Sequence, residues 1–219
     1  NLQIQVCLDA TASMGIGAKF DHAANVAALL SVVGLNRRDR VRLGCIGGIH
    51  PMETGVLTGC EPRSIHPFAA FLNRLEAGGH GDEHQQFLAQ AAKIRSDQLY
   101  FVSDLLMPEP ELDRLIRSLA MTSHRPILVH VVSADDVDMD LSGTLCAVDA
   151  ETGQTVEIRG SRLLQSAYRK EIEHWLHYIQ ESCARWGVFY VRTDTVENPR
   201  DLLLGVLREA GFVYTGAGT

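Results

Sequence analysis

Four oxygen-bearing side chains follow two apolar runs of the sequence. Asp9, Thr11 and Ser13 come directly after the first such run, and Asp104 comes directly after residues 99–103. Carboxylates and hydroxyls are the hard oxygen ligands that Mg²⁺, Mn²⁺ and Ca²⁺ prefer. The alternate spacing of the first three residues turns their side chains towards one point if the backbone there stays extended. Mg²⁺ usually keeps several waters, so these four side chains suffice for a candidate divalent-cation site.

The elements that must position these residues can be predicted from the apolar pattern. Short apolar, β-branched runs predict buried strands at residues 3–8, 41–46, 99–103, 127–132 and 188–191, with a short edge strand at 55–58. Helices are predicted at residues 19–33 (stopped by Gly34 and Asn36), 65–75, 83–94, 111–120, 161–186 and 199–210 (stopped by Gly211). The helix at 161–186 carries an apolar stripe with a 3.6-residue period, made of Ile172, Trp175, Leu176, Ile179, Cys183 and Trp186.

Buried strands that alternate with helices predict a doubly wound, mostly parallel α/β sheet with helices on both faces. Ligands of such sheets bind outside the carboxyl ends of the strands, near the reversal of strand order. Two short strand-like runs around residues 149–153 predict a β-hairpin at about 143–159. We interpret residues 1–219 as a single domain that carries this hairpin as an insertion.

The composition excludes several classes of protein. The net charge of −7 lacks the basic excess of a nucleic-acid-binding domain. No apolar run is long enough to span a membrane, and no signal peptide opens the chain. The five cysteines are odd in number and contain no C-x-x-C, which predicts a reducing, cytoplasmic location, with Cys7, Cys45 and Cys146 as small core residues. Because a strand begins almost at Asn1, we interpret the chain as a fragment of a longer protein.

The sequence resembles a known family. The segment LDATASM, from Leu8, is similar to the D-x-S-x-S motif of the von Willebrand factor A domain, with Thr in place of the first Ser. Lys19 and its alanine-rich helix follow in the family's order, as do DRVRLGCI, LYFVSDLL and HVVSADD. The hairpin segment AVDAETGQTVEI and Tyr168 resemble the bacterial branch of unknown function that is encoded beside MoxR-type AAA+ ATPases.

The resemblance implies a metal-ion-dependent adhesion site. Thr11 and Ser13 would bind Mg²⁺, Mn²⁺ or Ca²⁺ directly, and Asp9 and Asp104 would act directly or through water. An open coordination position would then take a carboxylate from a partner protein, which we expect to be a MoxR-type ATPase or its client. The family usually supplies a further Thr from a Gly-Gly-Thr loop. Here that loop reads GGHGD from Gly78, so His80 or Asp82 substitutes for the Thr or the site is degenerate.

Other interpretations of the same residues remain open. Asp9 and Thr11 are also residue types that cap loops and helices, and Asp104 is a common turn residue. A Mg²⁺-dependent phosphoryl-transfer hydrolase would use Asp9 as its nucleophile, but Thr11 stands where the second Asp of its D-x-D motif is required. A third possibility is a purely structural domain that has lost its metal site.

Neither a G-x-S-x-G elbow nor a phosphate-binding P-loop occurs, so we expect a non-enzymatic domain.

Two further polar clusters are predicted to be surface residues and not ligand-binding or catalytic sites. His174 and His177 lack a third ligand at zinc spacing and are predicted to be solvated. The acidic run at residues 135–140 lacks the Gly and Glu of a calcium loop and is predicted to be a solvated loop.

Overall fold

The computed structural model describes residues 1–48, 56–78, 96–148 and 153–213. A six-stranded sheet forms its centre, in the order β3-β2-β1-β4-β5-β8. The strands are β1 (Gln3–Ala10), β2 (Arg40–Gly47), β3 (Val56–Gly59), β4 (Ser96–Ser103), β5 (Ser123–Val132) and β8 (Phe189–Asp194). All neighbours pair in parallel except β3, which runs antiparallel to β2 at one edge. The predicted doubly wound α/β fold and its short edge strand are therefore confirmed.

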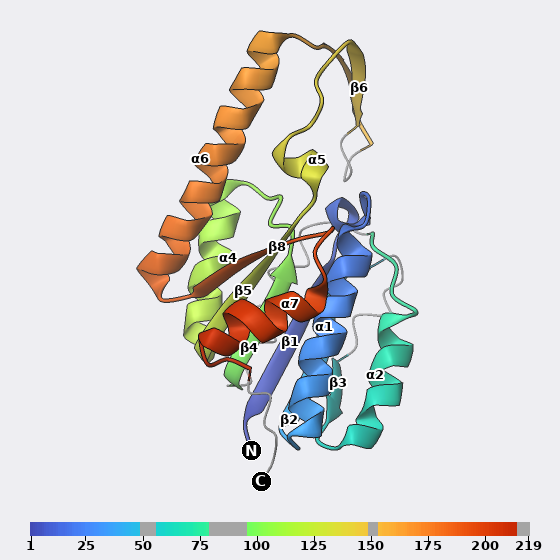
Figure 1. The fold of residues 1–219 in the computed structure, drawn as a ribbon, viewed down its shortest axis with the longest axis vertical. Helices are drawn as coiled ribbons and strands as arrows, with labels where there is room; N and C mark the ends of the chain where they lie inside the picture. The colour runs from blue at the N-terminus through green and yellow to red at the C-terminus, as the bar shows by residue number, and fades with distance from the viewer. Residues whose placement is uncertain (49–55, 79–95, 149–152, 214–219) are drawn as a thin grey trace.

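The order of the strands reverses at the centre of the sheet. From β1 the chain proceeds outward to β2 and β3, and it then returns to pair β4 against the other side of β1. The carboxyl ends of β1 and β4 are consequently neighbours, and both point towards the upper part of the molecule in Figure 1. Ligands of doubly wound sheets bind at this kind of position.

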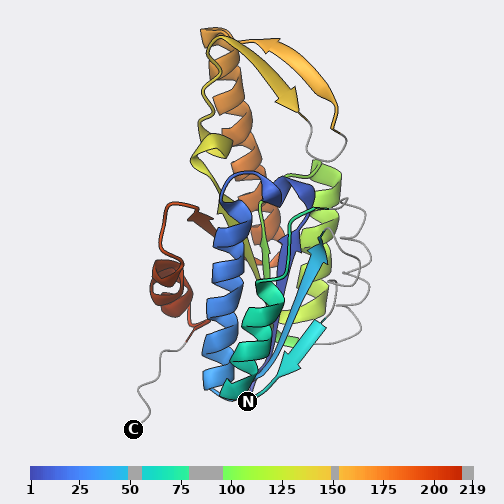
Figure 2. The same ribbon diagram turned by 90° about the vertical axis from the view of Figure 1, so that its right-hand side faces the viewer.

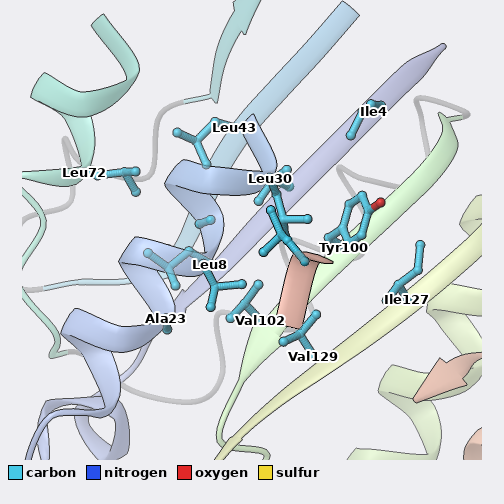
Figure 3. Packing of buried hydrophobic residues seen from close by; sticks show 14 of the residues in the cluster. Ile4, Leu8, Ala23, Leu30, Leu43, Leu72, Tyr100, Val102, Ile127 and Val129 are labelled. Atoms are coloured by element: carbon cyan, nitrogen blue, oxygen red, sulfur yellow. The ribbon is translucent and has the colours of Figure 1, made fainter. Parts of the chain in front are cut away.

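Helices cover both faces of the sheet. Helices α1 (Lys19–Asn36), α2 (Ile65–Leu72) and α7 (Pro199–Leu202) lie on one face, and α4 (Glu109–Thr122) and α6 (Arg162–Trp186) lie on the other (Figures 1 and 2). Side chains of successive strand residues alternate between the faces, so Leu8 packs under α1 while Cys7 packs towards α4. Figure 3 shows the first of these two clusters, in which Leu8, Leu30 and Val102 lie together.

A segment between β5 and α6 extends beyond the body of the domain. It contains the short helix α5 (Ala134–Val137) and the antiparallel strands β6 (Thr144–Val148) and β7 (Thr155–Arg159), which form a separate two-stranded sheet. Residues 134–148 and 153–161 are named the arm below. The arm stands at the carboxyl-end side of the main sheet together with the amino-terminal half of α6 (Figures 1 and 2). The predicted hairpin is confirmed.

The apolar stripe predicted on α6 is buried only in part. Ile179 and Cys183 are buried against the sheet and α4, whereas Ile172 is half-buried and Trp186 is 36% exposed. Ile172 is less buried because the amino-terminal half of the helix projects past the sheet beside the arm, and Trp186 is the last residue of the helix. None of the described helices is long and apolar enough to cross a membrane.

Several predicted boundaries were wrong. Helix α1 continues through Gly34 to Asn36, because Gly34 is a close-packing residue: a Cβ there would lie 2.6 Å from Val41. The closing helix is interrupted at Gly205, whose φ of −91° and ψ of −108° are non-helical.

The prediction that three cysteines are core residues was right for two of them. Cys7 and Cys45 are buried as predicted, whereas Cys146 is exposed because its strand belongs to the arm. The helix predicted at residues 83–94 lies outside the described residues.

Candidate metal centre

Asp9 lies at the carboxyl end of β1 and is held by hydrogen bonds from two directions. Its Oδ1 accepts from the Thr11 backbone N–H (3.0 Å) and from Thr11 Oγ1 (2.8 Å). Its Oδ2 accepts from Ser103 Oγ of β4 (2.6 Å). The side chain is 1% exposed. Asp9 therefore ties the ends of the two central strands together and presents its carboxylate inside the site.

A short 3-10 helix, η1 (Ala12–Gly15), brings Ser13 back towards Thr11. The extended geometry that the sequence suggested holds for Thr11, with φ of −66° and ψ of 168°, but not for Ser13. Instead, the Met14 N–H donates to the carbonyl of Thr11 (3.1 Å) and closes a turn. The Thr11 and Ser13 hydroxyls consequently lie 3.3 Å apart, so the predicted convergence is correct although its predicted cause was wrong.

Asp104 reaches the same point from the end of β4. Ser13 Oγ donates to Asp104 Oδ1 (3.2 Å), and the N–H of Leu106 donates to the same oxygen (3.3 Å). The turn after Asp104 places the buried Leu105 at φ of 56°, a left-handed conformation that is unfavourable for a bulky residue. Backbone strain of this kind concentrates at functional sites. All four residues predicted from the sequence thus meet in one place.

These oxygens are linked by hydrogen bonds whose lengths are close to the spacing of neighbouring ligands around a small divalent cation. From Asp9 Oδ1 through Thr11 Oγ1 and Ser13 Oγ to Asp104 Oδ1, neighbouring atoms are 2.8, 3.3 and 3.2 Å apart. Adjacent ligands of an octahedral Mg²⁺ lie about 2.9 Å apart, and those of Ca²⁺ lie roughly 0.5 Å further apart. Among the described residues no three His, Cys, Asp or Glu side chains gather as a metal site. A cation bound beside the four oxygens above would be held by two carboxylates and two hydroxyls, which are the oxygen donors that hard cations prefer.

A lysine completes the site and was not predicted as part of it. Lys19, the first residue of α1, is 0% exposed, and its Nζ lies 2.8 Å from Asp104 Oδ2 and 3.4 Å from Asp136 Oδ1. Burial raises the pKa of the Asp104 carboxyl; the Lys19 ammonium opposes this shift, and the charge of Asp9 adds to it. A sequence signal did exist, because a lysine in the first turn of a helix opposes the helix dipole unless an acid compensates it.

Asp136 lies in the acidic run that was predicted to be a solvated loop, and for this residue the prediction was wrong. Its Oδ2 accepts hydrogen bonds from the backbone N–H and the hydroxyl of Ser133. Its own backbone N–H donates to Ser133 Oγ (3.3 Å), and this bond forms a capping box at α5 together with the bond from the Ser133 N–H to Oδ2. Its backbone carbonyl accepts from Tyr168 Oη on α6 (2.9 Å). Asp136 therefore joins the base of the arm to both α6 and Lys19.

The loop in which the family supplies a further Thr begins beside the site. The N–H of Gly78 donates to the carbonyl of Ala10 (2.8 Å), at the end of β1. His80 and Asp82, the two residues considered as substitutes, lie outside the described residues. Gly47 on β2 also approaches closely, since a Cβ there would lie 2.9 Å from the backbone of Ala10 and Thr11.

The alternative roles of these residues find partial support in the geometry. Asp9 Oδ1 accepts from the N–H of Thr11 and Asp104 Oδ1 accepts from the N–H of Leu106, so each carboxylate also stabilises the turn that follows it. Neither α1 nor η1 has a side-chain cap, so Asp9 and Thr11 do not cap these helices. Both oxygens of Asp9 accept hydrogen bonds and the side chain is buried, whereas a nucleophilic carboxylate requires access to its substrate. His174 and His177 are exposed and pair with Glu109 and Glu181, as expected for surface residues.

Comparison with known proteins identifies the fold. The sequence matches no protein-family model and no curated protein. Among solved structures, BatB from Bacteroides thetaiotaomicron, described as a conserved hypothetical protein, is similar with a TM-score of 0.54 and 14% identity, over 89% of this chain and 91% of that one. The SpRpn10 VWA domain is similar with a TM-score of 0.53 and 14% identity over the whole of both chains.

A third similar structure is an aerotolerance-related membrane protein from Bacteroides fragilis, with a TM-score of 0.54, 12% identity, and coverage of 95% of this chain and 98% of that one. At these identities the likeness concerns the fold alone. The chain therefore has the fold of a VWA domain, with a β-hairpin in addition to its six-stranded sheet.

Proposed function

We propose that this chain is a non-enzymatic protein-interaction domain that binds its partner through a divalent cation at a degenerate metal-ion-dependent adhesion site. The observation that carries the proposal is the convergence of Asp9, Thr11, Ser13 and Asp104 at the reversal of strand order. The cation is Mg²⁺, with Mn²⁺ and Ca²⁺ as chemically similar substitutes. When bound, it supplies a Lewis-acidic position that accepts a carboxylate from the partner.

The charge of the site supports this role. Within the group formed by Asp9, Asp104, Asp136 and Lys19, the carboxylates outnumber the ammonium by two. Such an excess of negative charge in a poorly solvated place favours a divalent cation. The burial of Asp9, which is 1% exposed, favours a fixed role within the site over that of a nucleophile, which must reach its substrate.

The family resemblance motivates our choice of partner. We propose a MoxR-type AAA+ ATPase, or a client that it remodels, as the protein that is bound in the cytoplasm. The position of the arm supports an extended contact, since the hairpin stands at the same end of the molecule as η1 in both views (Figures 1 and 2). A partner that reaches the cation therefore approaches beside the hairpin.

Calorimetric titration with Mg²⁺ and Mn²⁺ tests the cation site. The native chain is expected to release heat with a single-site isotherm, and Ser13→Ala is expected to weaken binding at least tenfold because it removes a direct ligand. Ser166→Ala is the matched control, since Ser166 is an exposed serine on α6. No heat with the native chain, or equal affinity in Ser13→Ala, would contradict the proposal.

A pull-down tests the partner. The native chain, Ser13→Ala and Ser166→Ala are immobilised and mixed with a purified MoxR-type ATPase, with Mg²⁺ or with EDTA. Capture by the native chain and by Ser166→Ala, and loss of capture in EDTA and in Ser13→Ala, is the expected result. Capture that is insensitive to EDTA would remove the cation from the interaction.

A further inference from the structure

Lys19 is a buried cation inside a group of carboxylates. Its side chain is 0% exposed, and its ammonium lies 2.8 Å from Asp104 and 3.4 Å from Asp136. Asp104 directly follows β4, whereas Asp136 lies in α5, the short helix that follows β5. An ammonium without water is stable only if acids or other acceptors surround it. Lys19 is therefore committed to this site whether or not a divalent cation is bound.

The carboxylates need such a cation. Asp9 and Asp104 are 1% and 2% exposed, and each raises the electrostatic energy of the other. Two ionised carboxylates that share a poorly solvated site repel each other strongly, and a positive charge within about 4 Å relieves that repulsion. The Nζ of Lys19 meets this condition at Asp104. The ammonium donates a hydrogen bond to Asp104 Oδ2, while Asp104 Oδ1 accepts one from the Ser13 hydroxyl.

We propose that Lys19 is the resident cation of this site, a positioning residue that holds Asp104 in place and neutralises it, so that the domain folds without a divalent ion. The divalent ion then binds to Asp9, Thr11, Ser13 and the remaining oxygen of Asp104, against the repulsion of the ammonium. Lys19 thus lowers the affinity for the divalent ion. This second part rests on the proposed function, whereas the first part does not.

The same ammonium connects the site to the arm. Asp136 binds Lys19 through Oδ1 and caps α5 through Oδ2, and its carbonyl accepts from Tyr168 of α6. Asp104, Lys19 and Asp136 therefore form a continuous polar chain from the end of β4 to the base of the arm. Replacement of Lys19 interrupts this chain at its centre.

Urea unfolding in EDTA tests the role of Lys19 without any metal. Lys19→Met keeps most of the side-chain volume and removes the charge. Its folding equilibrium constant is expected to fall at least about a hundredfold, because it leaves buried carboxylates without their counter-ion. The double variant Lys19→Met/Asp104→Asn is expected to regain at least tenfold of this loss, since the acid is neutralised as well. Lys170→Met, at an exposed lysine of α6, is the control and is expected to unfold like the native chain.

The outcomes separate the two parts. Lys19→Met as stable as the native chain in EDTA, or a double variant that is no more stable than Lys19→Met, overturns the resident cation. If Lys19→Met does not fold but the double variant does, the result supports the resident cation. If neither variant folds, the result contradicts it.

Repetition of the unfolding experiment in Mn²⁺ tests the second part. Mn²⁺ is expected to raise the folding equilibrium constant of both chains. The factor by which it raises the constant of Lys19→Met is expected to be at least ten times the factor for the native chain. Equal gains overturn the competition between ammonium and divalent ion. If Mn²⁺ stabilises no variant, the proposed function fails, and the EDTA comparison still decides the role of Lys19.

Discussion

The hydroxyl of Ser13 donates a hydrogen bond of 3.2 Å to Asp104, a residue 91 positions further along the chain. This contact joins η1, which follows β1, to the turn that follows β4. Because β1 and β4 are parallel neighbours, both segments leave the sheet at the same edge. The contact brings the candidate ligands at the two strand ends together, and it makes their arrangement dependent on the position of each strand end.

We expect Asp104→Asn to destabilise the metal-free domain by about 3–5 kcal/mol, because it leaves the buried Lys19 ammonium with a weaker partner. Urea unfolding in EDTA measures this loss. Asp138→Asn is the matched control: Asp138 pairs with Arg169 on the surface, and the loss there should not exceed about 1 kcal/mol. Equal effects of the two changes would show that the pair of Lys19 with Asp104 is no stronger than a surface pair.

The arm should loosen when Asp136 is replaced. Asp136→Ala removes the acceptor that caps α5 and the second partner of Lys19, which corresponds to about 1–2 kcal/mol. Amide hydrogen exchange across residues 134–148 should accelerate roughly tenfold, while β1 and β4 remain protected. Asp135→Ala, at an exposed neighbour in the same helix, serves as the control. Unchanged exchange in the arm would show that Asp136 does not hold its base.

Gly47→Ala should displace the backbone of Ala10 and Thr11 and so distort the site. Gly47 has a φ of 75°, and a Cβ would lie 2.9 Å from the backbone of Ala10 and Thr11. Strain and collision together should lower stability by about 2–4 kcal/mol and weaken Mn²⁺ binding. Gly143→Ala, with a φ of 78° and open space around the Cβ position, isolates the backbone strain, roughly 1 kcal/mol. If Gly47→Ala behaves like Gly143→Ala, the close approach has no influence on the site.

Stability should fall in mild acid because of His130. Its ring is buried and accepts or donates a hydrogen bond at Nδ1 to Tyr190 Oη, and burial lowers its pKa to about 3. Below a pH of about 6.5 the unfolded chain takes up a proton at this residue while the folded chain does not. The free energy of unfolding therefore decreases by about 1.4 kcal/mol for each pH unit between roughly 6.5 and 3.

His22 and Asp104 also titrate in this region, with opposite signs, so a difference between variants isolates His130. Urea unfolding of His130→Phe at pH 6.5, 5.5 and 4.5 should show a pH slope smaller than that of the native chain by about 1.4 kcal/mol per unit. Parallel slopes for His130→Phe and the native chain would mean that His130 is protonated in the folded domain.

Much of this protein was determined by the sequence alone. Alternation of buried strands with helices is a local pattern, so the doubly wound sheet, the edge strand and the hairpin could be predicted from it. The place of Asp9, Thr11, Ser13 and Asp104 could also be predicted, since each lies at the end of a strand or shortly after it and parallel strands end at one edge. The 3-10 turn that brings Ser13 to Thr11 was missed, because several loop conformations satisfy the same short sequence.

Only the tertiary structure decided how the site is charged and supported. Lys19 meets acids that are 85 and 117 positions away, and Ser103 meets Asp9 across 94 positions. Local periodicity carries no information about such pairs, because they arise only when strand order brings separate loops together. Burial then makes them strong, since a lysine without water must be paired. For this reason the four oxygen-bearing side chains could be located from the sequence, whereas the fold determined that a buried ammonium lies among them.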